Sequence, residues 1–486
     1  MNRPIRTVSL FCLALFLALM INSTYLQFWR SSSLDEDPLN QRVQQASYSS
    51  ERGAILVGRT AVAESTPSDD RFEFQREYPQ PLVYAPLTGY FTFGDSTGVE
   101  SSQNAVLSGE DPRFFVRNLV DLVSNSQQNG GSVELTINAK AQRAAYDGLS
   151  ALGPDVEGSV VAIEPDTGKI LAMVSLPTFD PNDLASHDFD AVSKAYKSLE
   201  ADPGDPLLNR AVQTRIFPGS TFKVVTAAAA LESGKYDSAD SLVPGGATFQ
   251  LPQTSGETGL VDNEGRSCGA GEITFRLAME QSCNTTFAQL AIEVGSEAML
   301  EQAEKFGFNT DYLEDLGRQA RSVFPAELSP PELGQAGFGQ FEVQSTPLQM
   351  AMVSAAIANG GVVMRPYVVS EVQSPDYDAE TTDPEELSEA ISPATADVLT
   401  DLMVSTVDAG TAAPAAIPNI AVGGKTGTAQ RGVPDQPPYA WFISFAPATD
   451  AKVAVAVMIE EAPGQQVAGG ALGGPIAKAV MEAVLS

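Results

Sequence analysis

Histidine is almost missing from this 486-residue chain, because His187 is its only example. This scarcity argues against metal sites built from several histidines, and any Ser-His-Asp triad would have to use His187. That residue lies in the polar stretch 185–190, which we interpret as a surface loop, and no nucleophile-elbow motif accompanies it. We therefore predict no metal and no cofactor.

Basic residues are also few, since 29 lysines and arginines face 61 aspartates and glutamates and give a formal net charge of −32. A protein this acidic repels a phosphate backbone, so we predict no nucleic-acid partner. A chain of 486 residues exceeds the usual length of one domain, and two folded units are the first expectation.

Cysteine is the third scarce residue. Cys12 lies near the N-terminus, and Cys268 and Cys283 lie far downstream. Because sequence does not fix the distance between two thiols, a disulfide between Cys268 and Cys283 and a pair of unpaired thiols both stay open.

Charge is absent from residues 7–29, and this apolar run exceeds the length of about 20 residues that crosses a bilayer. Two arginines in residues 1–6 favour a cytoplasmic tail, and Tyr25 and Trp29 suit the outer interface. No Ala-x-Ala type site follows the run, so we favour an uncleaved anchor over a signal peptide. The sequence thus predicts a single-pass membrane protein whose remaining residues lie outside the cell.

Residues 30–132 combine β-branched, aromatic and turn-forming residues, which predicts short strands with long loops and a non-catalytic, β-rich pedestal domain. Residues 110–114 match the Glu-Asp-x-x-Phe of glycan-polymerising domains. We reject that reading because the His-x-Gly that should follow is absent and about 100 residues leave little room for such a domain. We interpret the stretch as a charged loop before a helix that contains residues 115–123.

Residues 133–486 show the alternation of strand and helix patterns that is typical of an α+β domain. An antiparallel sheet with helices packed on it is the expected architecture. The expected strands are 133–137, 158–163, 170–174, one around Lys425 and 440–446, the expected helices are 139–152, 347–358 and 476–485, and 376–389 is expected as a solvated acidic loop.

The stretch Pro218-Gly219-Ser220-Thr221-Phe222-Lys223 precedes a run of alanines and valines. Pro218 and Gly219 break the preceding structure, and we expect Ser220 to open a helix in which Lys223 lies on the same face. A desolvated lysine loses its proton readily, so the pair can form an activated nucleophile without histidine. Alone, Ser-x-x-Lys is also frequent by chance on solvated helices.

Two later stretches hold the groups that such a site requires. Ser282-Cys283-Asn284 offers a hydroxyl and an amide, and Lys425-Thr426-Gly427-Thr428 offers a cation and two hydroxyls on a predicted small-residue strand. Each stretch alone is weak evidence for an active site, because the first is typical of loops and helix caps and the second is typical of exposed hairpins. The three in this order are much more specific.

This order of motifs resembles the penicillin-binding proteins and serine β-lactamases. Cys283 stands where the family pattern has Asp. The anchor, Arg52-Gly53-x-Ile55 and Asn209-Arg210-Ala211 extend the similarity to class B penicillin-binding proteins, most of all the actinobacterial penicillin-binding protein A type. The resemblance implies the transpeptidase fold in residues 133–486, above the pedestal of residues 30–132 and the anchor.

The resemblance also implies roles for individual residues. Ser220 would be the nucleophile and Lys223 its base, with Ser282 and Asn284 as the second catalytic motif. The terminal carboxylate of the substrate would bind at a third motif, and backbone N–H groups of two residues would form the oxyanion hole. The third motif is Lys425, Thr426, Gly427 and Thr428, and the oxyanion donors are Ser220 and Thr428.

The implied activity is D,D-transpeptidation, which cross-links peptidoglycan stem peptides in division or cell-shape control. Implied partners are stem peptides, lipid-linked precursors, β-lactams and a glycan-polymerising membrane protein. A β-lactamase, a D,D-carboxypeptidase and a non-catalytic scaffold of the wall-synthesis complex remain as alternatives.

Overall fold

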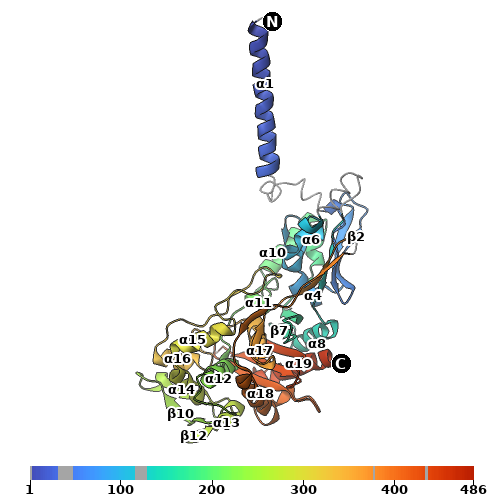
Figure 1. Ribbon diagram of the computed structural model, residues 1–486. Coiled ribbons are helices and arrows are strands. Elements are labelled where there is room, and N and C mark those ends of the chain that lie inside the picture. Colours follow the sequence, from blue (N-terminus) through green and yellow to red (C-terminus); the bar gives the residue numbers. More distant parts are fainter. Residues whose placement is uncertain (1–2, 31–47, 115–128, 376–377, 433–435) are drawn as a thin grey trace.

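The computed structural model describes residues 3–30, 48–114, 129–375, 378–432 and 436–486 (Figure 1). The linker-like stretch 31–37 and the helix expected over residues 115–123 lie outside these ranges.

The N-terminal helix α1 (Arg3–Thr24) continues into a π-helical turn, η1 (Tyr25–Trp29). Together they make a 27-residue helix with a mean hydropathy of 2.1 in its most apolar window, and none of that window is buried against the protein. At 1.5 Å per residue this helix is about 40 Å long, which exceeds the hydrocarbon thickness of about 30 Å. It is therefore long and apolar enough to anchor the chain in a membrane.

A six-stranded sheet, which we call the pedestal sheet, has the order β15-β14-β6-β1-β2-β3. Two of its strands come from near residue 370, and Figure 1 shows the orange strand of that region running up beside the blue strands. The N-terminal segment thus starts a sheet that a distant part of the chain completes. The strands are β1 (Ile55–Val57), β2 (Thr60–Pro67), β3 (Phe74–Glu77), β6 (Ser132–Leu135), β14 (Val369–Gln373) and β15 (Ala379–Thr381).

The acidic stretch 376–389 is not the loop that the sequence predicts. Beyond residues 376–377, which are not described, it forms β15 and β16 (Glu386–Glu389), which pair with β14 and β13 (Val362–Met364). The side chains of β15 remain exposed although its backbone is paired. Charged residues suit such an edge strand because they discourage further pairing.

The second large sheet is antiparallel, with the order β17-β18-β19-β7-β8. Its central strand β19 was not anticipated, although its apolar run suits a strand buried on both faces. One face of the sheet packs against α8 and α19, and the other face packs against α17. Successive apolar side chains along each strand point to opposite faces, so both faces are apolar. The elements are β7 (Glu157–Ile163), β8 (Ile170–Leu176), β17 (Gly423–Ala429), β18 (Tyr439–Ala446), β19 (Val453–Glu461), α8 (Ala139–Ser150), α17 (Pro347–Ala358) and α19 (Gly469–Leu485).

A group of helices lies beside this sheet (Figure 1). Helix α12 is at its centre, and every residue of that helix except the last is buried. The remaining helices here are α13 (Phe275–Glu280), α14 (Asn284–Val294), α15 (Ser296–Lys305), α16 (Pro330–Ala336) and α18 (Pro393–Asp408), with α12 spanning Lys223–Glu232. Short ribbons pair β9 (Leu242–Pro244) with β12 (Glu272–Thr274) and β10 (Thr248–Gln250) with β11 (Leu260–Asp262).

Most expected elements are present with small shifts. Helix α17 has the expected bounds, whereas α19 begins seven residues before the expected 476 because Pro475 is accommodated inside it. The expected strand 133–137 is β6, which ends at Leu135. Connecting elements are α4 (Pro81–Thr88), β4 (Phe91–Thr92), β5 (Asp95–Ser96), α5 (Gly98–Ser102), α6 (Asn104–Ser108), η2 (Pro112–Phe114), α9 (Asn182–Ala185), α10 (Phe189–Glu200), α11 (Arg210–Gln213), η4 (Glu257–Gly259) and η5 (Ala413–Ala415).

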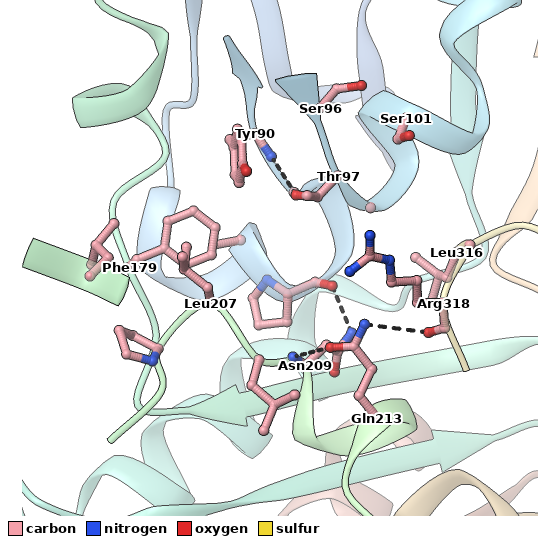
Figure 2. A pocket seen from close by; sticks show the side chains of 18 of the residues that line it. Tyr90, Ser96, Thr97, Ser101, Phe179, Leu207, Asn209, Gln213, Leu316 and Arg318 are labelled. Atoms are coloured by element: carbon pink, nitrogen blue, oxygen red, sulfur yellow. Dashed lines mark hydrogen bonds between the residues drawn. The ribbon is translucent and has the colours of Figure 1, made fainter. Parts of the chain in front are cut away.

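A pocket of about 810 Å³ lies where the pedestal meets the segments that follow β8 (Figure 2). On the pedestal side Thr97 Oγ1 accepts a hydrogen bond from the Tyr90 N–H at 3.3 Å. On the other side Asn209 Nδ2 donates to the Pro86 carbonyl at 2.8 Å. The bond between Asn209 and Pro86 links the pedestal to the larger part of the molecule.

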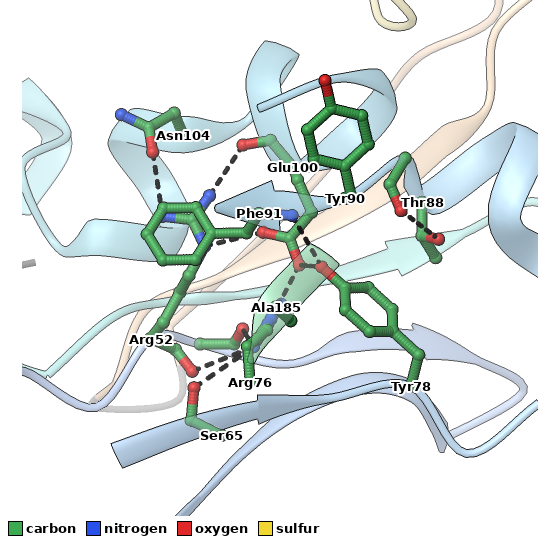
Figure 3. Close-up of polar contacts among 12 residues, drawn as sticks. Arg52, Ser65, Arg76, Tyr78, Thr88, Tyr90, Phe91, Glu100, Asn104 and Ala185 are labelled. Atoms are coloured by element: carbon green, nitrogen blue, oxygen red, sulfur yellow. Dashed lines mark hydrogen bonds and ion pairs between the residues drawn. The ribbon is translucent and has the colours of Figure 1, made fainter. Parts of the chain in front are cut away.

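A buried ion cluster holds the pedestal together (Figure 3). Glu100, which is fully buried, lies 2.6 Å from Arg52 Nε and 2.7 Å from Arg76 Nε. Its Oε1 also accepts from the Tyr78 hydroxyl at 3.1 Å. Burial raises the pKa of Glu100, but the two guanidiniums outweigh burial and hold it below its ordinary value.

Candidate active site

Ser220 lies in a 3-10 turn, η3 (Gly219–Phe222), and not in the first turn of the helix as expected. Helix α12 begins at Lys223, so the serine and the lysine sit on either side of the junction. Gly219 has a φ of +53°, which favours glycine, and a Cβ there would lie 2.9 Å from the Thr428 carbonyl oxygen. The turn therefore packs directly against strand β17.

Several hydrogen bonds fix this turn, and one of them joins the Gly219 N–H to the Gly339 carbonyl at 3.0 Å. Trp441 Nε1 on β18 donates to the Phe217 carbonyl at 3.0 Å. Thr221 Oγ1 donates to the Pro218 carbonyl at 2.7 Å. Ser220 itself is buried, with 8% of the residue exposed.

The amine of Lys223 meets the second motif. Its Nζ lies 2.7 Å from the Ser282 carbonyl, 3.1 Å from Ser282 Oγ and 2.6 Å from Asn284 Oδ1. Ser282 has a φ of +55°, a left-handed conformation that is uncommon for serine and turns both of its oxygens toward the lysine. Segments about 60 residues apart in the chain thus converge on one amine.

Lys425 reaches the same hydroxyl from β17. Its Nζ lies 2.8 Å from Ser282 Oγ and 2.9 Å from the Thr426 carbonyl. The Ser282 hydroxyl therefore bridges two amines. Because a hydroxyl has one proton, it can donate only to whichever of the two amines is neutral.

Both amines lose basicity in this environment. Burial, then the positive charges of Lys425 and Arg266, lower the pKa of Lys223 well below its ordinary value, while Glu264 opposes them. Burial and then Arg266 lower the pKa of Lys425 to about 7. A lysine with such a lowered pKa has a neutral fraction near neutral pH and can accept a proton.

Strand β17 is an edge of its sheet, and its small residues let the η3 turn, which contains Ser220, approach. A Cβ on Gly427 would lie 3.0 Å from the Pro218 carbonyl oxygen. Thr426 and Thr428 are half-buried, and Thr426 Oγ1 lies 2.8 Å from Thr411 Oγ1. All three predicted motifs therefore meet: Lys223 and Lys425 converge on the Ser282 hydroxyl, and β17 packs against the turn that contains Ser220.

Cys268 and Cys283, whose pairing the sequence leaves open, form a disulfide with a Cα–Cα distance of 5.9 Å. Cys283 stands between Ser282 and Asn284, the two residues predicted for the second motif. The bond therefore ties that motif to the loop that contains Cys268.

His187 is not the exposed loop residue that the sequence suggests. Its side chain is only 10% exposed and its Nδ1 pairs with Asp70. Its ring lies 4.9 Å from the Phe72 ring and 5.5 Å from the Tyr48 ring, centroid to centroid. The aromatic residues that cover it, Tyr48 and Phe72, come from the pedestal, and no local pattern around His187 predicts that contact. Among the described residues, no group of three or more His, Cys, Asp or Glu is arranged to hold a metal ion.

Several residues around the site were missed by sequence reasoning. Trp441 supports the nucleophile turn, as described above, and Arg266 acts on both amines. Gly469 opens α19, and a Cβ there would lie 2.4 Å from the Gly427 carbonyl oxygen. None belongs to a recognisable motif, and only the presence of a tryptophan in the predicted apolar strand 440–446 offered a signal.

Comparison with known proteins gives concordant matches. Residues 158–482 match the family described as Penicillin binding protein transpeptidase domain, and residues 52–133 match the Penicillin binding protein A dimerisation domain. The chain is 42% identical to the Peptidoglycan D,D-transpeptidase PbpA of Mycolicibacterium smegmatis and 40% identical to that of Mycobacterium tuberculosis, in each case over 100% of this chain and 99% of the relative. The structure of penicillin-binding protein A from M. tuberculosis as a ceftriaxone acyl-enzyme complex superposes with a TM-score of 0.86 at 40% identity, over 91% of this chain and 100% of that chain.

Proposed function

Because this chain belongs to the penicillin-binding protein transpeptidase family, we propose that it is a peptidoglycan D,D-transpeptidase whose Ser220 forms the acyl-enzyme. The expected family and fold class are confirmed by these matches. The observation that carries the proposed site is the convergence of Lys223 and Lys425 on the hydroxyl of Ser282, beside the turn of Ser220.

In the first half-reaction, Ser220 Oγ attacks the carbonyl carbon of the terminal D-Ala-D-Ala bond. The neutral fraction of Lys223 takes the proton of the hydroxyl, which its lowered pKa permits. Negative charge then develops on the carbonyl oxygen. The backbone N–H groups of Ser220 and Thr428 are proposed to stabilise this oxyanion, and one such donor typically contributes about 3 kcal/mol.

Collapse of the tetrahedral intermediate breaks the C–N bond and releases D-Ala. The Ser282 hydroxyl is placed to pass the proton from Lys223 toward the leaving amine, since it contacts the amines of Lys223 and Lys425. Thr426 and Thr428, with Lys425 behind them, are proposed to bind the terminal carboxylate.

In the second half-reaction, an amine of a neighbouring stem peptide attacks the acyl-enzyme and restores Ser220. A β-lactam enters the same first step, because its strained amide replaces the D-Ala-D-Ala bond. The ring nitrogen remains attached after opening, so the acyl-enzyme is released slowly.

Labelling with a fluorescent penicillin tests the role of Ser220. Mass spectrometry of the wild-type chain should show one adduct on the peptide that contains Ser220. Ser220→Ala should show none, whereas Ser198→Ala, which removes an exposed hydroxyl on α10, should label like wild type. An adduct that persists in Ser220→Ala would overturn the assignment, and rapid turnover of nitrocefin would indicate a β-lactamase.

The anchor and the domain division complete the proposal. We infer that residues 1–6 lie in the cytoplasm, that 7–29 cross the membrane and that the pedestal of 30–132 and the transpeptidase domain of 133–486 lie outside. The apolar length of α1 and η1 supports the anchor. Protease added to intact spheroplasts should then degrade the domains and spare a tag placed before Met1, and the reverse pattern would contradict this topology.

A glycan-polymerising membrane protein is the proposed partner, since anchoring places the enzyme beside lipid-linked precursors. Photo-crosslinkers placed on exposed positions of α1, such as Phe16, should capture it. A role in division or in cell-shape control stays a prediction, which imaging of a fluorescent fusion in growing cells would test.

A further inference from the structure

A threonine outside the three motifs contacts the third motif. Thr411 Oγ1 lies 2.8 Å from Thr426 Oγ1, and both residues are half-buried. Thr411 follows helix α18 and precedes Thr426 by 15 residues. It therefore contacts one of the residues proposed above to bind the terminal carboxylate of the substrate.

The segment 409–412 is held against the end of α18. The backbone N–H groups of Gly410 and Ala412 both donate to the Thr406 carbonyl, at 3.1 and 3.0 Å. Thr406 Oγ1 in turn donates to the carbonyl of Gly424, which belongs to β17. The segment is thus fixed to the strand of the third motif by a second contact besides the pair of hydroxyls.

The end of α13 holds Thr411 from another side. The Thr411 N–H donates to the Glu280 carbonyl at 3.3 Å, and the Glu280 carboxylate accepts from the Ser405 hydroxyl. A Cβ on Gly410 would lie 2.7 Å from the same carbonyl oxygen, so glycine is needed for this close approach. Because Glu280 lies two residues before Ser282, these contacts also tie the second motif to the segment beside the third.

Helix α19 packs on both threonines. A Cβ on Gly470 would lie 2.7 Å from the Thr411 carbonyl oxygen and 3.2 Å from Thr426 Cγ2. The backbone of Thr411 is therefore held by α13, α18 and α19 together. Since a β-branched side chain has few χ1 rotamers, its hydroxyl is presented to Thr426 at a defined position.

The two hydroxyls constrain where each proton can go. Without a substrate carboxylate, either oxygen of the pair can be the donor. A carboxylate only accepts hydrogen bonds, so Thr426 must use its single proton to bind one. Thr426 Oγ1 can then only accept from Thr411, and the two hydroxyls form one chain of donors that ends on the carboxylate.

Resting on the proposed function, we propose that Thr411 is a positioning residue that orients the Thr426 hydroxyl toward the terminal carboxylate of the substrate and so favours ligands that carry a free carboxylate. A donor at position 411 keeps the proton of Thr426 directed at the ligand. Without that donor, Thr426 retains its hydroxyl but loses the partner that orients and polarises it. The loss should therefore appear only with ligands that carry the anion.

The test compares the acylation of the full-length chain in detergent by benzylpenicillin, which has a carboxylate, and by its methyl ester, which has none. Thr411→Val keeps the branched shape of the side chain and removes the hydroxyl. It should lower the second-order rate constant for benzylpenicillin about tenfold, the effect of one hydrogen bond, and that for the ester by less than about twofold. Thr411→Ser, which keeps the hydroxyl, should stay within about twofold of wild type for both probes.

Thr400→Val makes the same change at another half-buried position, on α18, and is the matched control. It should alter neither rate constant by more than about twofold. A fall of equal size for both probes in Thr411→Val, or an equal fall in Thr411→Ser, would overturn the proposal, because a role in packing does not distinguish the anion. An unchanged rate constant for benzylpenicillin in Thr411→Val would also overturn it.

A double-mutant cycle with Thr426→Val asks whether Thr411 acts through Thr426. Once Thr426 has no hydroxyl, Thr411→Val should lower the rate constant for benzylpenicillin by no more than about twofold further. A full loss of about tenfold in that background would show that Thr411 acts elsewhere and would overturn the proposal. If wild type is not acylated at Ser220, the proposed function itself fails, whereas equal acylation of wild type and Thr411→Val rejects only the role of Thr411.

Discussion

Ser282 is the residue on which the contacts of the proposed site converge. Its φ of +55° orients its carbonyl and hydroxyl toward Lys223, and the hydroxyl also contacts Lys425. A left-handed conformation in a serine is uncommon, and such positions concentrate at functional sites because the surrounding structure must enforce them. Here the disulfide and the start of α14 follow within one and two residues.

Removing that hydroxyl should slow proton transfer without unfolding the protein. We expect both Ser282→Ala and Ser282→Gly to acylate about 100-fold more slowly with penicillin, the lower range for loss of general acid–base catalysis. Ser282→Gly should be the more stable of the two, because glycine accepts the positive φ. Stopped-flow measurement of the acylation rate reports the effect on proton transfer, and thermal unfolding reports the effect on stability. Equal acylation rates in wild type and both variants would show that the hydroxyl takes no part in the mechanism.

Lys425 illustrates a conflict between stability and function. Its pKa of about 7 in the folded protein lies below its ordinary value of 10.5, so between these pH values the unfolded chain binds one proton more than the folded one. Stability therefore rises with pH through this window, and the cost of burying the amine is greatest below about pH 7.

Lys425→Met should consequently stabilise the protein while abolishing acylation. The gain should be about 1–4 kcal/mol at pH 6 and should shrink as the pH approaches 10.5. Urea unfolding at pH 6 and pH 9.5 measures this gain in the free energy of unfolding. Lys194→Met, at an exposed position of α10, is the matched control. A gain that does not depend on pH would mean that packing, not proton linkage, explains it.

At the scale of elements, the pedestal depends on one buried carboxylate. Glu100 of α5 pairs with Arg76 of β3 and with Arg52, which precedes β1 (Figure 3). Two of the elements involved are short, because β1 has only three residues and α5 five. The ion cluster is thus a joint between elements that are individually too short to be stable.

Glu100→Gln should leave two buried guanidiniums without a counter-charge. We expect a loss of about 3–5 kcal/mol in the free energy of unfolding, measured by urea titration. Glu110→Gln, which changes an exposed carboxylate at the end of α6, should stay within about 0.5 kcal/mol of wild type. A cost below about 1 kcal/mol for Glu100→Gln would show that water reaches and solvates the arginines.

At the scale of the whole molecule, the pedestal is not closed within its own segment. Strand β6 lies between β1 and β14, with Ser132 opposite Gln373 and Leu135 opposite Val369. Val372 of β14 contributes to the main core. The pedestal and the larger part of the molecule are consequently joined by a shared sheet as well as by chain connectivity.

A fragment of residues 48–138 should therefore lack a fixed tertiary structure. Without β14 the backbone of β6 is exposed along one edge, which invites aggregation. Near-UV circular dichroism and urea titration should show no cooperative unfolding, whereas fusing residues 365–382 to the fragment should restore it. Cooperative unfolding of the unfused fragment would contradict the shared-sheet interpretation.

The sequence by itself determined the features that depend on residue type and local spacing. These are the apolar N-terminal helix, the apolar strands such as β7 and β18, the helix α17, and the order of the Ser220, Ser282 and Lys425 motifs. Each is encoded within a window of one element, where periodicity and turn residues act over a few positions. The family and the chemical groups of the site followed from them.

Only the tertiary structure decided which distant groups meet. The hydroxyl of Ser282 bridges two lysines, one of them 143 residues away, and β14 enters a sheet begun by the N-terminal segment. The disulfide, the burial of His187 and the action of Arg266 on the amines likewise arise from contacts between separate elements. No local pattern encodes such contacts, because burial and the summed charges of neighbours are properties of the folded arrangement.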